Sequence, residues 1–149
     1  MAKDDNPDLI NHFDKVAHRM IFGGQILLAR KFSDRFSLQI TPSFIHRNIV
    51  PFEDENNLLS IGLASRIQLT KVIGFLLDFT YPISEYRSDN DIPIPLGFGF
   101  EFDTGGHVFQ LNFTNATGLS AVDYIPYTTS KWGEGQFRMG FTISRLFNL

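Results

Sequence analysis

The feature that most constrains this chain is a period-two alternation of side chains that runs from Arg19 to the C-terminus. Successive residues of a β-strand point to opposite faces of a sheet, so such an alternation predicts strands. The segment 96–103 shows it most clearly, with Leu or Phe at even positions and Gly, Glu or Asp at odd ones. Six further segments carry the same pattern: 20–32, 36–47, 59–69, 73–81, 107–114 and 137–149. The chain is therefore predicted to be all-β, with about seven antiparallel strands.

The two faces of these strands differ in a way that favours a membrane. One face carries large apolar residues at nearly every position, and the other carries mainly Gly, Ala, Ser, Thr, Gln and a few charges. A transmembrane barrel turns its apolar face to lipid and its polar face to the interior. Only Arg30 and Arg145 fall on the apolar face, each near a strand end where a long side chain can reach the interface. We therefore predict an up-and-down transmembrane β-barrel of the bacterial outer membrane, with the lipid bilayer as its partner.

Composition narrows the remaining classes. Hydrophobic residues make up 43% of the chain, but none of the apolar runs reaches the roughly 20 residues that a spanning helix needs. The sequence holds no cysteine, which excludes a disulfide scaffold and a thiolate metal site. A net charge of -3 lacks the basic excess that would direct the chain to nucleic acid.

The connections between the predicted strands alternate in length. Residues 33–35, 70–72 and 103–106 form tight turns, whereas 48–57, 83–94 and 115–134 are long and polar. Outer-membrane barrels have short periplasmic turns and longer extracellular loops, so we expect the long connections to face the cell exterior. Residues 1–18 are expected to be a loop segment with a short helix, because Asn6 can cap a helix that Pro7 begins; the barrel strands then occupy 19–149.

An odd number of strands predicts that this barrel is partial. Bacterial single-chain barrels use an even number of strands, and an unpaired strand edge in lipid costs several kcal/mol per backbone group. We therefore expect an open, curved sheet in which the first strand, near Met20 to Lys31, does not close against the last, Gln136 to Asn148. The missing strands would come from upstream residues or from a partner chain.

Several polar residues are candidates for chemistry or transport. His18 and His46 lack a metal-ligand spacing, and the scattered serines lack a nucleophile-elbow pattern, so no catalytic, cofactor-binding or metal-ligating residue is predicted. The charges on the polar face could line a solute path or could brace a filled barrel through ion pairs; these are Arg66, Asp78, Glu101 and Arg138. With two arginines and two acids they are balanced, so no ion selectivity follows. Arg66 and Asp78 are expected to pair diagonally across neighbouring strands.

Short motifs along the chain resemble those of one known family. These are Gly23-Gly24-Gln25, Ala29-Arg30-Lys31-Phe32, Pro42-Ser43-Phe44, His46-Arg47-Asn48 and the run Gly105 to Leu111. The chain is similar to a family of outer-membrane β-barrels from Bacteroidetes that is labelled only as a domain of unknown function. The resemblance spans about Asn6 to Leu149 and implies location and fold, since its motifs are strand and turn patterns. It also implies that this chain corresponds to the C-terminal half of the longer family members.

These observations lead to one expected function and two alternatives. We expect a non-enzymatic, porin-like envelope barrel of a Gram-negative bacterium, acting as a passive channel or as a structural or binding platform; its solute stays unknown. One alternative is a surface barrel hydrolase, and the other is a soluble β-barrel that carries a hydrophobic ligand. Detergent dependence would distinguish the soluble alternative, and conductance would distinguish a channel from a platform.

Overall fold

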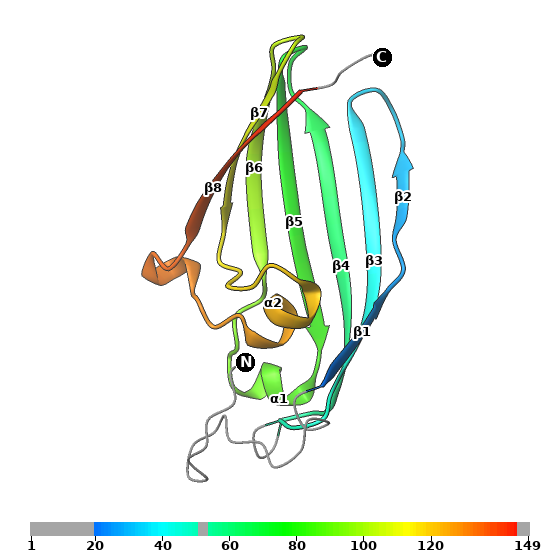
Figure 1. Ribbon diagram of the computed structural model, residues 1–149, viewed down its shortest axis with the longest axis vertical. Helices are drawn as coiled ribbons and strands as arrows, with labels where there is room; N and C mark the ends of the chain where they lie inside the picture. The colour runs from blue at the N-terminus through cyan, green and yellow to red at the C-terminus, as the bar shows by residue number, and fades with distance from the viewer. Residues whose placement is uncertain (1–19, 51–53, 146–149) are drawn as a thin grey trace.

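The computed structural model describes residues 20–50 and 54–145, which form one curved antiparallel sheet (Figure 1). Its strands follow chain order: β1 (Ile21–Gln25), β2 (Leu28–Lys31), β3 (Phe36–Arg47), β4 (Asn57–Gln68), β5 (Ile73–Ile83), β6 (Leu96–Asp103), β7 (Val108–Thr114) and β8 (Arg138–Ser144). Three short helices lie in the long connections: α1 (Glu85–Asp89), α2 (Ala121–Tyr127) and the 3-10 turn η2 (Trp132–Glu134). The predicted all-β antiparallel fold is confirmed, whereas the helix expected in residues 1–18 lies outside the described residues.

The segments β1 and β2 are two halves of one strand, so the eight segments make the seven predicted strands. Gln25 faces Ser43 and Leu28 faces Ile40, which means that the register is unchanged across the gap. Inside the gap, the Ile26 amide donates to the carbonyl oxygen of Pro42 at 3.0 Å. Proline has no N–H to donate in return, so the ladder is interrupted at this point.

The tight turns gather at one end of the sheet and the long connections at the other (Figure 1). In the β4–β5 turn, the Thr70 hydroxyl oxygen accepts from the amides of Val72 and Ile73 at 3.2 and 2.9 Å. In the β6–β7 turn, Gly105 adopts a φ of 81°, a backbone conformation that glycine reaches without steric cost. The predicted alternation of connection lengths is therefore confirmed.

The outer face of the sheet is apolar, and it is exposed on every strand except β7, which is half-buried. Phe141 keeps 63% of its surface exposed and Met139 keeps 68%, and similar residues cover β3 to β6. The single tryptophan lies on this face, with the ring centroid of Trp132 5.4 Å from those of Phe98 and Phe137. Fully burying such a side chain is worth roughly 1.5–3 kcal/mol, so a surface made of many of them requires a nonaqueous environment. Within the described residues, no helix is both long and apolar enough to cross a membrane.

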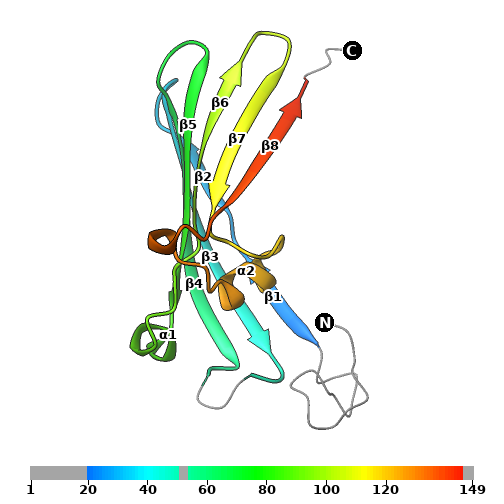
Figure 2. The same ribbon diagram turned by 90° about the vertical axis from the view of Figure 1, so that its left-hand side faces the viewer.

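The inner face is concave and carries small and polar residues. Figure 2 shows the sheet curling around α2, while the η2 turn lies on the opposite side. One row of the register crosses this face through Gln39, Ala64, Asp78, Gly97 and Thr114. The buried apolar core of the described residues lies where α2 meets this face, and it consists of Ile45, Leu58 and Ile125.

The two edges of the sheet do not meet. In the described part of the chain, β1 and β2 pair with β3, β8 pairs with β7, and no ladder joins the first strand to the last. The open curved sheet expected from the sequence is therefore confirmed. Because every neighbouring pair is antiparallel along this seven-strand path, β1 and β8 run in the same direction.

The two faces can be distinguished by placing an arginine on each. At Phe141, in the middle of β8 on the outer face, an arginine should lower the free energy of unfolding from lipid vesicles by about 2–4 kcal/mol. The control is Thr142→Arg on the inner face, which should change the free energy of unfolding by less than about 1 kcal/mol. Denaturant titration in vesicles measures both, and equal losses at the two positions would contradict the assignment of faces.

Candidate functional site

The connection between β7 and β8 folds over the inner face of the sheet near its long-loop end (Figure 2). Ile125 of α2 is fully buried against Ile45 and Leu58. On the first strand, Gly23 provides the space that α2 needs, because a Cβ atom there would lie 2.5 Å from Val122 Cγ1. The helix therefore packs inside the curve of the sheet and occupies part of the interior.

A buried asparagine holds the two ends of this connection together. The Asn115 side chain accepts from the Leu96 amide at 2.8 Å and donates to the carbonyl oxygens of Ile94 and Ser130, both at 2.9 Å. Arg138 adds a second tie, since its Nη1 donates to the Asn115 carbonyl oxygen at 3.3 Å and to Ser130 Oγ at 3.2 Å. Both amide hydrogens and the amide oxygen form hydrogen bonds, so the fold of the connection is closely specified.

Two buried arginines fix the C-terminal end of α2 from neighbouring loops. Arg47 donates to Asp54 Oδ1 at 3.0 Å and to the Glu55 carbonyl oxygen at 2.6 Å, and its guanidinium lies 5.6 Å from the centre of the Tyr127 ring. Such a cation–π contact contributes about 0.5–2 kcal/mol.

The second of these arginines is Arg87 of α1, whose Nη1 donates to the Pro126 carbonyl oxygen at 2.7 Å. Burial lowers the pKa of the Arg87 guanidinium, and the nearby Asp54 carboxylate opposes that shift. An arginine keeps its charge throughout the physiological range, so Arg87 remains a cationic donor to the end of α2.

A small polar cavity lies on the inner face beside α2. It is lined by hydroxyl, amide and carboxylate groups, together with Leu27, Gly62 and Leu63; the polar members are Gln25, Gln39, Thr41, Asp78, Thr80 and Tyr124. Burial raises the pKa of the Tyr124 phenol, a hydrogen bond with Thr80 lowers it, and the Asp78 charge raises it further. Tyr124 is therefore a neutral hydrogen-bonding group at neutral pH.

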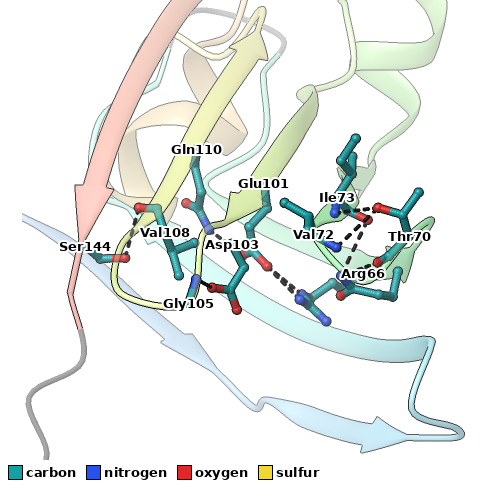
Figure 3. Close-up of polar contacts among 11 residues, drawn as sticks. Arg66, Thr70, Val72, Ile73, Glu101, Asp103, Gly105, Val108, Gln110 and Ser144 are labelled. Atoms are coloured by element: carbon teal, nitrogen blue, oxygen red, sulfur yellow. Dashed lines mark hydrogen bonds and ion pairs between the residues drawn. The ribbon is translucent and has the colours of Figure 1, made fainter.

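A second polar network lies toward the tight-turn end (Figure 3). Arg66 donates to Glu101 Oε1 from Nε at 3.1 Å and from Nη2 at 2.6 Å, and Gln110 donates to Glu101 Oε2 at 2.9 Å. The pair spans β4 to β6 above Gly74 of β5, where an added Cβ would lie 3.6 Å from Glu101 Oε1 and 3.8 Å from Arg66 Nε. The ion pair therefore lies directly over Gly74, at ordinary van der Waals distance from where a Cβ atom would be.

The expected pairing of Arg66 with Asp78 is therefore wrong, although the register on which it rested is right. Arg66 lies opposite Leu76, and Leu69 donates to Ile73 across the turn as predicted. The side chain of Arg66 extends over Gly74 toward Glu101, and thus away from Asp78. Sequence periodicity gives the face of a residue but not the direction in which a long side chain leans.

The four charges singled out from the sequence do not form one set. Arg66 and Glu101 pair with each other, Arg138 begins β8 and binds the β7–β8 connection, and Asp78 forms no ion pair within the described residues. Sequence analysis did not single out Asn115, Arg47 or Arg87 as the buried residues that hold the β7–β8 connection in place. The Ser120-Ala121-Val122-Asp123 sequence, whose Ser120 hydroxyl donates to Asp123 at 2.6 Å, is the capping pattern that could have revealed α2.

Of the candidate histidines, His46 lies on the outer face and His18 lies outside the described residues. The two ring nitrogens of His46 lie 2.7 Å from Asn57 Oδ1 and 2.9 Å from Asn48 Oδ1. Among the residues that the structure describes, no three His, Asp or Glu side chains gather as metal ligands would.

Comparison with known proteins gives one match. A family model described as a membrane bound beta barrel domain, DUF5777, matches residues 2–147. No curated protein and no solved structure gave a significant match. The match covers nearly the whole chain and agrees with the curved, two-faced sheet described above.

A double-mutant cycle tests the Arg66–Glu101 pair. Either single change, Arg66→Met or Glu101→Met, leaves one hydrogen-bonding group without its partner, so the coupling energy of the pair should reach about 1 kcal/mol or more. The control combines Arg66→Met with Asp78→Asn, and the losses in unfolding free energy caused by these two changes should add. Unfolding free energies in vesicles measure both cycles; coupling to Asp78 in place of Glu101 would contradict the observed pairing.

Proposed function

Since this chain belongs to the DUF5777 family of membrane-bound β-barrel domains, we propose that it forms part of an outer-membrane β-barrel that passes small polar solutes passively. A non-enzymatic role of this kind needs a polar interior with free space and a means of limiting what enters. The inner face provides the polar lining with free space, and the inward-folded β7–β8 connection limits what enters.

The observation that carries this proposal is the small size of the inner-face residues of β6 to β8 away from α2. One register row runs from Arg66 and Leu76 to the smaller Gly99, Asn112 and Gly140, and the row beside it includes Ala64 and Gly97. Large side chains would fill a barrel that serves only as a solid support, and they lie here mainly on the outer face. Together with α2, this leaves an interior that is open near the tight turns and narrowed near the long loops.

Closing the barrel requires further strands, and their number is constrained. Both edge strands run in the same direction, so an antiparallel ladder can connect them only through an odd number of additional strands. A second copy of this sheet, turned about the barrel axis, would place β8 parallel to β1 and would not satisfy this rule. We propose that the sheet is the C-terminal part of a larger single-chain barrel in a Gram-negative envelope, as its resemblance to barrels from Bacteroidetes also suggests.

A closed platform is the second candidate, and the dense packing around Ile125 and Asn115 favours it. A surface hydrolase has less support within the described residues. His46 and His107 contact the outer-face rings of Phe22 and Phe109, on the side opposite the inner-face serines such as Ser43 and Ser60. A catalytic histidine would have to lie beside its nucleophile.

Orientation can be tested with single cysteines, because the chain has none of its own. Cysteine at Leu119, a fully exposed position in the β7–β8 connection, should react with a membrane-impermeant maleimide on intact cells. Cysteine at Thr104, in a tight turn, should react only after the outer membrane is opened. The reverse labelling pattern would invert the proposed topology.

Conductance of the purified barrel in planar bilayers tests the channel itself. We expect small, steady conductance steps, which should rise several-fold when residues 118–127 are replaced by a Gly–Ser segment of equal length, since α2 then no longer narrows the interior. Leu119→Ser, within the same connection but without packing contacts to lose, should leave the conductance unchanged. Absence of conductance in all three proteins would favour the platform.

A further inference from the structure

We infer that Asp78 gives the passage a preference for small cations. This inference rests on the proposed channel and identifies the class of solute that its narrow region favours. Asp78 lies in the middle of β5 on the inner face, in the polar cavity beside α2. An ion in the passage responds to those inner-face charges that are not neutralised by a partner.

Two other acidic groups have cationic partners, whereas Asp103, at the tight-turn end, accepts a hydrogen bond from the Gly105 amide. Arg66 and Glu101 form a 2.6 Å ion pair, and Arg47 and Asp54 form one at 3.0 Å. At distances beyond a few Å, each pair presents little net charge to an ion in the interior. Asp78 forms no ion pair within the described residues, and its side chain is exposed to the interior.

Of the remaining cations, Lys31 pairs with Asp34 at 2.7 Å at the tight-turn end, and two arginines are engaged by the β7–β8 connection. Arg87 is 5% exposed and donates to the Pro126 carbonyl oxygen, so its charge lies behind α2 and away from the interior. Arg138 lies in the same register row as Asp78 but three strands away, with Gly97 and Thr114 between them. It donates to the Asn115 carbonyl oxygen and Ser130 Oγ at the rim. Asp78 is therefore the charge that an ion beside α2 meets first.

The surroundings of Asp78 suit a partly dehydrated cation. Thr41, Thr80 and Tyr124 contribute hydroxyl oxygens to the same cavity, and Gln25 and Gln39 contribute amide oxygens. The neighbours of Asp78 across the sheet are Ala64 and Gly97, which leave room next to the carboxylate.

This arrangement favours transient contact over tight binding. A tight calcium site needs six to eight oxygen ligands arranged around the ion, generally with several carboxylates, whereas one carboxylate with neutral oxygens attracts an ion weakly enough for it to leave. The expected ions are monovalent metal cations and small organic ammonium ions.

Reversal potentials in a KCl gradient test the assignment on the barrel as it assembles in its membrane. The unaltered protein should pass K⁺ in preference to Cl⁻, because one unit charge about 4 Å from an ion in water enriches K⁺ about five-fold and depletes Cl⁻ by a similar factor. Asp78→Asn, which keeps the shape of the side chain, should bring the permeability ratio close to one. Asp78→Glu should restore the preference, which would show that charge and not misfolding explains the loss.

The matched control removes a different carboxylate from the same protein. Asp103 accepts from the Gly105 amide in a tight turn, and asparagine can accept there as well, so Asp103→Asn should leave the preference unchanged. A conducting protein that prefers Cl⁻, or one whose K⁺ preference survives Asp78→Asn, would overturn this inference while leaving the channel intact. No conductance from any variant would instead count against the proposed function and the inference together.

Discussion

The structure depends on one constraint, which is that a backbone in lipid must satisfy its own hydrogen bonds. An antiparallel sheet meets this need along its length and leaves only its two edges unsatisfied. The alternation of apolar and polar residues then follows, because each strand has to face lipid on one side and the interior on the other. Even the local break at Ile26 reflects this constraint, since Pro42 cannot return the hydrogen bond that it accepts.

Curvature of the sheet creates an interior, and the long β7–β8 connection uses it. The part that includes α2 folds inward, where Asn115 and Arg87 provide hydrogen-bonding partners and Arg47 provides a cation–π contact, while η2 lies over the outer face. Burial of Ile125 against Ile45 and Leu58 adds the apolar contact that keeps α2 in place. Charged residues of the inner face thus serve mostly to hold loops and strands together, whereas Asp78 forms no ion pair within the described residues.

The sequence was sufficient to predict the strands, their faces, the alternation of connections and the open edges, because each depends on local periodicity and on counting. Positions 96–103 were predicted to the residue. The sequence was insufficient for the Arg66–Glu101 pair, which depends on the direction in which the two side chains extend across three strands. It also did not reveal how α2 packs, since that contact joins residues about 100 positions apart, such as Gly23 and Val122. Such contacts depend on the curvature of the whole sheet.

The central claim is that the outer face of this sheet lies in lipid, and the single tryptophan provides a direct measurement. Trp132 stacks on Phe98 and Phe137 on that face, near the long-loop end where an interfacial aromatic belt belongs. The fluorescence of Trp132 should be quenched by brominated lipids, most strongly by those brominated near the headgroup, and only weakly by aqueous acrylamide. Strong quenching by acrylamide with no effect of brominated lipids would contradict the account.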